Sequence, residues 1–600
     1  MGPVIGRVRA HVGAVFIVIG LGLTNAQAQD LEISTAFIDE ELTESLRAAS
    51  LVRVVLDEAS STSQDVVAAA KADYKRYLSV LYQNGYYSGV VSILVDGREA
   101  AQLSPFETPD QVSKIEVEVT PGNPFTFGRA IVDPTAPGTE LPEDFRSGAL
   151  ARSGLIKQAA DASIQSWRDV GHAKAALTGQ RVTAAHQENA LNVDIKIDPG
   201  PRLTFGEMKI TGNTDVRTER IRAMAGFPAG AQFSDEDLET TQRRISRTGA
   251  FRFVVVEEAE TPNSDDTIDV IVELQEEKPR RLGFGAEIGS SDGISVSGFW
   301  FHRNLLGGGE RLRFDADLTQ QLEDGEELEF TFGVSFLRPA VFAPEADYFA
   351  SLDISREANS AFREDIATFD TGFNYRFSDE FFVYGGIRLS ATKTDLKPGK
   401  RRFRIFGTPV GATYDTRDIV TDARAGTFIT GEVFPFVGER DADDGVRTTL
   451  DARYYKSFIE DDALTLAVRG QLGSVFGATS GSVPESYLFF SGGGGTVRGQ
   501  PFESLGVTRN GSLSSGEGFA GLSLEARYRF TDAIGAVGFF DYGRITDGDI
   551  FNGTGDSHSG AGLGLRYDTP VGPIRVDIAA PVSGDTDDGV QFYFGLGQAF

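Results

Sequence analysis

The chain has 600 residues, no cysteine and a formal net charge of −30 at pH 7. The acidic balance argues against nucleic acid as a partner, because nucleic-acid phosphates are neutralised by Lys and Arg. The lack of cysteine excludes disulfides and Cys-based metal sites. A chain of this length has room for several domains of about 100–200 residues each.

The N-terminal segment has the pattern of a signal peptide. Arg7 and Arg9 precede an apolar run from Val12 to Leu23, and Ala26-Gln27-Ala28 follows that run. A charged start, a short apolar stretch and a small-x-small site together are typical of an exported chain. The run is shorter than the about 20 residues that span a bilayer. The sequence therefore predicts a signal peptide over residues 1–28.

A short phrase recurs three times in the first half of the chain, at residues 121–128, 199–206 and 279–285. Its Phe-Gly pair begins at residues 127, 205 and 284, which are 78 and 79 residues apart. Each phrase follows a run of alternating apolar and polar residues, which is typical of a half-buried strand. A fixed period of this size indicates tandem modules.

Each period also contains a helix-like stretch that ends at a glycine, as in residues 74–84, 159–170 and 235–248. Glycine just after a helix adopts the left-handed turn that satisfies the last carbonyl groups. Each module is therefore predicted as strand, helix, helix, strand, strand.

The repeated phrase resembles the end of the POTRA (polypeptide-transport-associated) domain. The resemblance implies three α+β POTRA modules in the periplasm, at residues 29–121, 122–199 and 200–277, which bind client or partner proteins. The modules would bind these proteins by strand addition at an exposed sheet edge. Unpaired backbone groups there can form hydrogen bonds with a partner strand of almost any sequence. The alternative is that the modules are rigid spacers without client contact.

The second half of the chain alternates without helical stretches. About 16 strand-like segments follow one another between residues 282 and 600, each near the 9–11 residues that cross a membrane. In residues 521–530, Leu522 and Leu524 alternate with Ser523 and Glu525. One face is apolar and the other is polar, as in a wall with lipid outside and water inside. Only a closed barrel places such a sheet in lipid without an unpaired edge.

The sequence therefore predicts an all-β, 16-stranded antiparallel transmembrane barrel over residues 280–600. The terminal Phe600 resembles the end signal of outer-membrane barrels, so the expected location is the outer membrane of a Gram-negative bacterium. A passive porin or anchor is an alternative, but it gives no reason for the modules.

A glycine-rich loop at residues 491–506 carries a lone cation, Arg498, after four consecutive glycines. The alternation places two carboxylates, Glu525 and Asp541, on the inner face of nearby strands. A loop folded inward would place Arg498 between them as a charge-assisted pair. The alternative is a solvated loop with an incidental arginine, and carboxylates that only line the lumen.

Three motifs make the resemblance to a known superfamily more specific. The loop motif Val497-Arg498-Gly499 and the strand motif Phe540-Asp541-Tyr542-Gly543 resemble those of outer-membrane assembly factors built from POTRA modules and a barrel. Residues 301–310 resemble the early periplasmic turn of the same superfamily. Gln500 stands where these proteins usually have an aromatic residue. The loop tip is therefore expected to pack less tightly, with the role of Arg498 unchanged.

Three modules before 16 strands resemble the TamA family, the outer-membrane subunits of the translocation and assembly module. That resemblance implies an inner-membrane-anchored TamB-like partner, unfolded outer-membrane clients such as autotransporters, and contact with the lipid bilayer. A two-partner-secretion pore and a general barrel assembly factor of the BamA type are the alternatives, usually with two and five modules respectively.

The two ends of the predicted barrel form a candidate seam. The first strand contains Gly283, Gly285 and Gly289, and the last contains Phe594 and Phe600. Glycines weaken strand pairing because they have no side chain to pack. The hypothesis is a seam that opens sideways so that a client strand can form on its edge. Such hydrogen-bond exchange implies no enzyme activity, cofactor, metal or catalytic residue.

Overall fold

The computed structural model describes residues 30–35, 40–57, 61–104, 112–289, 293–320, 328–358, 362–396, 399–459, 462–509, 512–569, 573–584 and 589–596. The predicted signal peptide at residues 1–28 and the terminal Phe600 lie outside these residues. The chain forms two compact units, residues 1–202 and residues 203–600. Each unit is described by itself.

The first unit begins with a four-stranded mixed sheet in the order β1-β4-β2-β3. β4 pairs with β1 in parallel and with β2 antiparallel. Three helices precede β2, and α3 packs its apolar face on the sheet around the fully buried Tyr77 and Leu81. The elements are β1 (Asp30–Thr35), α1 (Glu40–Ala49), α2 (Leu51–Asp57), α3 (Ser63–Gln83), β2 (Val90–Val95), β3 (Arg98–Glu99) and β4 (Lys114–Thr120).

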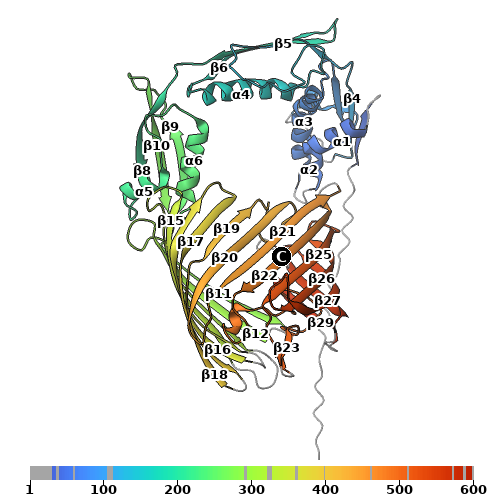
Figure 1. The fold of residues 1–600 in the computed structure, drawn as a ribbon. Helices are drawn as coiled ribbons and strands as arrows, with labels where there is room; N and C mark the ends of the chain where they lie inside the picture. The colour runs from blue at the N-terminus through green and yellow to red at the C-terminus, as the bar shows by residue number, and fades with distance from the viewer. Residues whose placement is uncertain are drawn as a thin grey trace, which may run out of the picture. The chain divides into compact units, whose positions relative to one another are not determined.

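The second sheet of this unit has the order β5-β7-β6, again with one parallel and one antiparallel pair. Its elements are β5 (Thr126–Asp133), α4 (Ser153–Asp169), β6 (Ala176–Ala185) and β7 (Ala190–Asp198). The segment between β5 and α4 is fully described and consists of turns. The prediction of two helices in every module is therefore wrong here, where α4 alone covers the sheet (Figure 1), and in the first module, which has the three helices α1, α2 and α3.

The second unit begins with a third sheet of the same topology, in the order β8-β10-β9. Its elements are β8 (Thr204–Thr211), α5 (Thr218–Ala225), α6 (Asp235–Ser246), β9 (Phe251–Glu258) and β10 (Thr267–Glu276). Gly85, Gly171 and Gly249 follow α3, α4 and α6 with φ of 85°, 100° and 68°. The prediction that a left-handed glycine ends each of these helices is confirmed.

A 17-stranded antiparallel, barrel-like sheet forms the rest of the second unit. Its strands are β11 (Arg280–Gly289), β12 (Gly293–His302), β13 (Arg311–Gln320), β14 (Glu329–Arg338), β15 (Ala346–Ala358), β16 (Phe362–Arg376), β17 (Phe381–Leu396), β18 (Gly399–Gly407), β19 (Val410–Asp415), β20 (Gly426–Arg440), β21 (Gly445–Phe458), β22 (Leu464–Phe476), β25 (Gly518–Arg529), β26 (Ile534–Asp547), β27 (Thr554–Tyr567), β28 (Ile574–Ser583) and β29 (Gln591–Leu596). β23 (Val507–Arg509) and β24 (Ser512–Ser514) form a separate hairpin between β22 and β25.

The count of 17 differs from the predicted 16 because one predicted strand is interrupted. β18 and β19 both pair with β17 on one side and with β20 on the other. The interruption falls at Thr408-Pro409. Proline has no backbone N–H to donate, so a ladder is readily broken at this position.

Side chains alternate between the two faces of the large sheet as the sequence predicts. In β25, Leu522, Leu524 and Tyr528 are exposed, while the intervening Ser523 and Glu525 are buried. The apolar side chains therefore cover the outer face and the charged ones point inward. No helix in the described part of the chain is long and apolar enough to cross a membrane.

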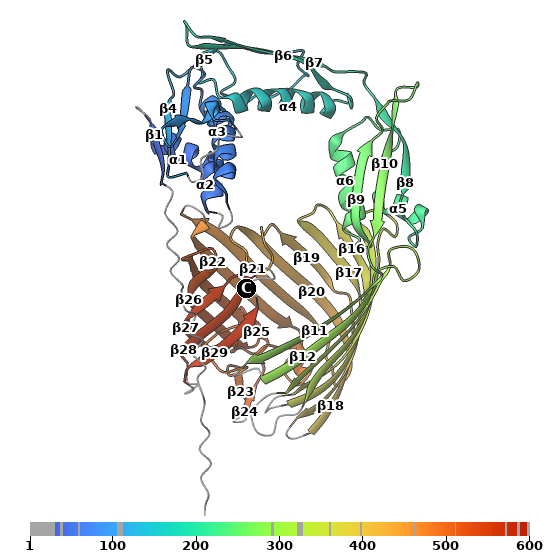
Figure 2. The ribbon, with the colours of Figure 1, turned by 180° about the vertical axis from the view of Figure 1, so that it is seen from behind.

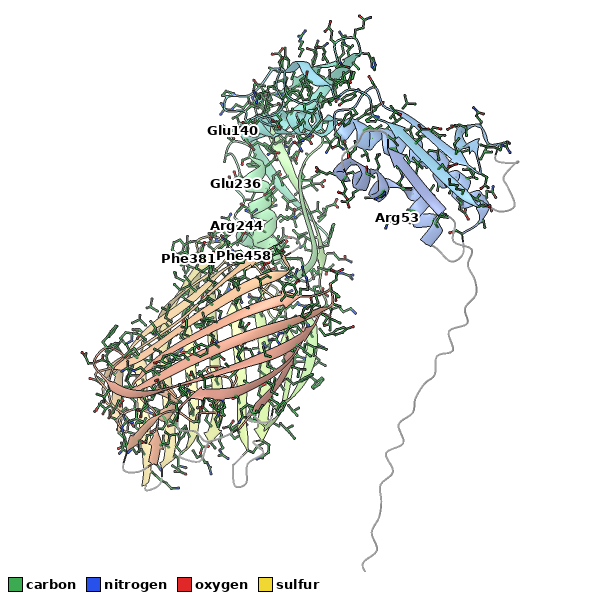
Figure 3. The ribbon with its side chains drawn as sticks, turned by 90° about the vertical axis from the view of Figure 1, so that its right-hand side faces the viewer. Arg53, Glu140, Glu236, Arg244, Phe381 and Phe458 are labelled. Atoms are coloured by element: carbon green, nitrogen blue, oxygen red, sulfur yellow. The ribbon has the colours of Figure 1, made fainter. Side chains whose placement is uncertain are left out.

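The third α+β module is docked on the turns at one end of the large sheet. Arg220 donates to the carbonyl of Pro339, and Arg247 donates to the carbonyl of Pro344. Arg244 pairs with Glu345, and Figure 3 shows it close to the sheet end that carries Phe381 and Phe458. Helices α5 and α6 thus hold the turns that follow β14, and they fix the module against the sheet.

Candidate functional site

The connection between β22 and β25 contains the arginine loop, residues 491–506, which closes on itself. Ser491 and Leu505 exchange backbone hydrogen bonds of 2.9 Å. Gly492 N donates to Thr496 Oγ1 at 2.8 Å, and Gly493 N donates to the carbonyl of Gln500 at 3.1 Å. Both glycines have positive φ, which other residues rarely adopt. The glycine run therefore builds a tight turn rather than a flexible tether.

The structure places Arg498 between Glu525 and Asp541, the two carboxylates predicted from the sequence. Arg498 Nε and Nη2 donate to the two oxygens of Asp541 at 2.7 and 3.0 Å. Arg498 Nη1 donates to Glu525 Oε1 at 2.6 Å. The backbone N–H of Arg498 also donates to Asp541, at 3.0 Å. The guanidinium thus binds one carboxylate with a fork and the other end-on.

This ion pair is excluded from solvent. Arg498 is 2% exposed, Glu525 4% and Asp541 1%. The guanidinium carbon lies 3.7 Å from the centre of the Phe539 ring, so a cation–π contact covers its face. Burial acts to lower the pKa of Arg498, but its hydrogen bonds to Asp541 and the charges of Glu525 and Asp541 raise that pKa above the ordinary value. The arginine therefore stays charged at every relevant pH.

Further buried charges extend the network along the inner face. Arg527 donates to Glu525 Oε2 at 2.8 Å, and Arg566 donates to Asp577. Asp577 Oδ2 lies 3.9 Å from Arg498 Nη1. Strands β25, β26, β27 and β28 each contribute a charged group to this network.

The loop tip beside Arg498 is anchored to the last strands. Gly499 N donates to the hydroxyl of Tyr593, on β29, at 3.0 Å. Gln500 Nε2 donates to the carbonyls of Ser559 and Ser583 at 2.7 and 3.0 Å. Gln500 is fully buried. The expectation of looser packing at Gln500 is therefore wrong, because its amide satisfies main-chain carbonyls that an aromatic side chain could not.

Two glycines on the strands allow the loop to approach their backbone. A Cβ on Gly543 would lie 2.9 Å from the Val497 side chain, and one on Gly560 would clash with the carbonyl of Arg498. Val497 and Gly543, both predicted from the motifs, are therefore in direct contact. Phe540, also part of the strand motif, lies on the outer face and is 37% exposed. It takes no part in the loop contacts described above.

Sequence reasoning missed several partners of the loop. Tyr593 and Asp577 alternate inward on their strands, so their orientation was predictable, but their contact with the loop was not. Phe539 is two residues before Asp541 on β26, so strand alternation places it on the inner face, but its contact with Arg498 had no signal in the sequence. Ser559 and Ser583 bind Gln500 through their main-chain carbonyls. Their side chains therefore give no sequence signal for this contact.

The ends of the large sheet form the candidate seam, seen in Figure 2. Cα atoms of β11 and β29 come within 8 Å of each other. No ladder joins the two strands within the described residues, although β11 is fully paired with β12. Phe284 is 87% exposed and Phe594 57%. Phe600, predicted at the seam, lies outside the described residues.

The seam glycines have separate surroundings. A Cβ on Gly283 would overlap the Phe299 ring of β12, so this glycine lets that ring lie against the strand. Gly285 faces Ser297, and Gly289 pairs with Gly293 at the end of the β11–β12 ladder. The glycines of β11 therefore do not prevent its pairing with β12. Within the described strands, the edge of β11 that has no ladder is the one on the side of β29.

The fold and site define a class of protein in which α+β modules precede a barrel-like sheet with an arginine loop docked inside. Residues 304–600 match the Omp85 superfamily domain, and residues 203–277 match the POTRA family, described as a surface antigen variable number repeat. Residues 203–600 are thus similar to a POTRA domain followed by an Omp85 superfamily domain.

Two curated relatives are named outer membrane protein assembly factor BamA. The one from Neisseria meningitidis serogroup B is 22% identical over 475 residues, which cover 68% of this chain and 58% of that protein. The one from Neorickettsia risticii is 22% identical over 515 residues, which cover 80% and 66%. The chain thus spans less than two thirds of the length of each.

The crystal structure of BamA from Haemophilus ducreyi lacking POTRA domains 1–3 superposes with a TM-score of 0.61 at 18% identity. The match covers 78% of this chain and 98% of that chain. At this identity the likeness establishes a shared fold.

Replacing Arg498 tests the strength of the buried pair. Arg498→Ala leaves Glu525 and Asp541 buried without this cation, so the folded sheet is expected to lose about 3–5 kcal/mol of stability. Arg498→Lys keeps the charge but loses the fork and the ring contact, so its loss should be intermediate. Unfolding in urea of the chain refolded into lipid bilayers measures both.

Arg313→Ala is the matched control. Its pair with Asp315 uses three hydrogen bonds of 2.5–2.8 Å, and its guanidinium lies 4.4 Å from the centre of the Phe299 ring, but the two side chains are 44% and 31% exposed. The expected loss is about 0–1 kcal/mol. Equal losses for Arg498→Ala and Arg313→Ala would contradict a bracing role for the buried pair.

Gly543→Ala is expected to displace the arginine loop, because the added Cβ would clash with Ser491 Oγ, at the start of the loop, and would lie 2.9 Å from the Val497 side chain. Since the chain has no cysteine, Val497→Cys supplies a single thiol, which should react slowly with a maleimide while the loop is docked. Gly543→Ala should make this thiol react quickly. Gly538→Ala on the same strand is the control, because its Cβ would lie 3.7 Å from its nearest neighbour. Unchanged labelling in the Gly543→Ala variant would show that the loop docks without this glycine.

Proposed function

We propose that this chain is an outer-membrane assembly factor that inserts client β-proteins through the seam between β11 and β29. The Omp85 superfamily domain would lie in the outer membrane, and the POTRA domain would lie in the periplasm. The apolar outer face and the polar inner face of the large sheet support this location, because a membrane barrel needs lipid-facing and water-facing sides.

The observation that carries the proposal is the edge of β11 beside β29, which no ladder joins in the part of the chain that the structure describes. A strand edge exposes N–H and C=O groups that can pair with an incoming strand. A client segment that pairs there would keep its backbone hydrogen-bonded as it enters lipid, where an unpaired group costs several kcal/mol. The mechanism is an exchange of backbone hydrogen bonds and needs no covalent chemistry, nucleotide or metal.

The arginine loop would keep one side of the seam rigid. The loop contacts described above all fall on β25–β29, through Arg498 on β25 and β26, through Gln500 on β27 and β28, and through Gly499 on β29. Opening between β11 and β29 breaks none of these contacts. The seam can therefore separate while the C-terminal strands stay together as a unit.

A TamA-type factor is the finer form of this proposal. The three sheets that precede the large sheet share a three-stranded arrangement, to which β3 adds a fourth strand in the first sheet, and this supports three POTRA modules at residues 29–121, 122–199 and 200–277. If β18 and β19 count as one interrupted strand, the large sheet has 16 positions around it. The partners proposed on this basis are an inner-membrane-anchored TamB-like protein and unfolded clients such as autotransporters.

Locking the seam tests the proposed function. Cysteines at Phe284 and Phe594, joined by a cleavable bis-maleimide, would hold the two exposed edges together. Client insertion into proteoliposomes should stop in the locked chain and return after the linker is cleaved, because the client strand would have no free edge to pair with.

A lock inside an existing ladder is the control. Phe314 and Val334 face each other in the β13–β14 pair, so a cysteine pair there should leave insertion unchanged. Normal insertion by the Phe284–Phe594 locked chain would overturn the seam mechanism.

A general assembly factor of the BamA type is the second candidate, and the two relatives with that name favour it. The candidates differ in their partner. A TamA-type chain should co-purify from membranes with a protein anchored in the inner membrane, and this recovery should fall when residues 29–202 are deleted. Equal recovery with and without those residues, or no such partner, would favour the BamA type.

A further inference from the structure

A row of apolar side chains crosses the outer face of β15–β18 and β20, which lie side by side in the large sheet (Figure 1). Direct cross-strand pairing joins neighbours in this row. All of its members are more than one third exposed. They are Leu352, Phe369, Leu389, Phe406 and Val437.

The next row toward the β17–β18 connection has small residues at its centre. Ala367 pairs with Ala391, and Ala391 pairs with Arg404. Two alanines between large side chains leave a hollow with a cavity volume of about 590 Å³, lined by the apolar row and by Arg404. This volume lies in the range of about 300–1,000 Å³ that is typical of ligand pockets.

The third row is charged. Asp365 pairs with Lys393, and Lys393 pairs with Arg402. The charged residues that line a second hollow of about 220 Å³ are four cations, Lys393, Arg402, Arg404 and Arg440, and one carboxylate, Asp365. Ala391 and Arg404 line both hollows, so a basic pocket adjoins the apolar one on the same face. The outer groove is defined as these two hollows together.

The cations of the outer groove are only weakly neutralised. Lys393 Nζ lies 4.0 Å from Asp365 and 3.8 Å from Asp395. Arg404 Nη1 lies 3.5 Å from Glu439, and both side chains are more than half exposed. Ion pairs this long and exposed contribute little stability. The chain has a net charge of −30, and these cations add little to its stability. The basic pocket is therefore better explained by binding of an anionic ligand than by a role in folding.

We propose that the outer groove binds one phosphorylated lipid of the surrounding leaflet. Lys393, Arg402 and Arg404 hold the phosphate, and an acyl chain lies in the apolar hollow along Phe369, Leu389 and Phe406. Arginine forks suit phosphate oxygens, and a basic pocket at the edge of an apolar belt is the arrangement that binds lipid head groups.

A lipid fits better than a soluble anion or a protein segment. A free phosphate would leave the apolar hollow unused, and an acidic peptide would have to enter a face that borders lipid. The inference rests on the proposed membrane location, and it adds a ligand that the assembly mechanism does not require.

Native mass spectrometry of the full chain in detergent, incubated with bisphosphorylated lipid A, tests the groove. The parent chain should retain lipid A but not the same lipid after dephosphorylation. The combined variant Lys393→Gln, Arg402→Gln and Arg404→Gln should reduce retention at least about ten-fold. Ala391→Leu should reduce it as well, because the larger side chain fills the hollow and keeps every cation.

Lys456→Gln is the matched control, because Lys456 is an exposed cation on β21, outside the groove. It should retain lipid A as the parent does. Unchanged retention in the triple variant, equal retention of the dephosphorylated lipid, or a dimer that Ala391→Leu disrupts would each overturn the proposal. Because no client protein is present, lipid retention and the seam experiment can fail independently of each other.

Discussion

The buried ion pair between Arg498 and its two carboxylates is the interaction on which the inner architecture depends. Three charges removed from water are costly, and their mutual attraction offsets that cost only when the geometry is good and the remaining donors are satisfied. Here Asp541 accepts from both the side chain and the backbone of Arg498, and Phe539 covers the guanidinium. Directed hydrogen bonds and the ring contact hold the loop in one position, which non-directional attraction between opposite charges would not do.

This geometry divides the large sheet into two groups of strands that are held together by different contacts. The C-terminal strands share the loop, the charged network and the anchors at Gln500 and Tyr593. The first strands have their ladders and, after β14, the docked POTRA domain. The junction between these sides is where β11 and β29 approach without a ladder in the described residues. A lateral opening there leaves every buried charge paired.

The inner-face carboxylates were predictable because strand periodicity alone fixes which residues point inward. Glu525 and Asp541 needed no tertiary information beyond that alternation. The contacts of Gln500 were not predictable, since its partners are main-chain carbonyls of strands distant in sequence. The break between β18 and β19 did have a signal in Pro409, which cannot donate to a ladder. The sequence contains no signal for the single helix of the second α+β module, because the repeat predicts two helices there.

Hydrogen–deuterium exchange of the refolded chain in bilayers can compare the seam with the strands under the arginine loop, because exchange reports local opening strand by strand. We expect slow exchange in β26, which lies under the arginine loop, and much faster exchange in β11 at the seam. Equal and strong protection of β11 and β26 would mean that the seam is as firmly paired as the strands that contact the arginine loop. That result would contradict a seam that opens sideways.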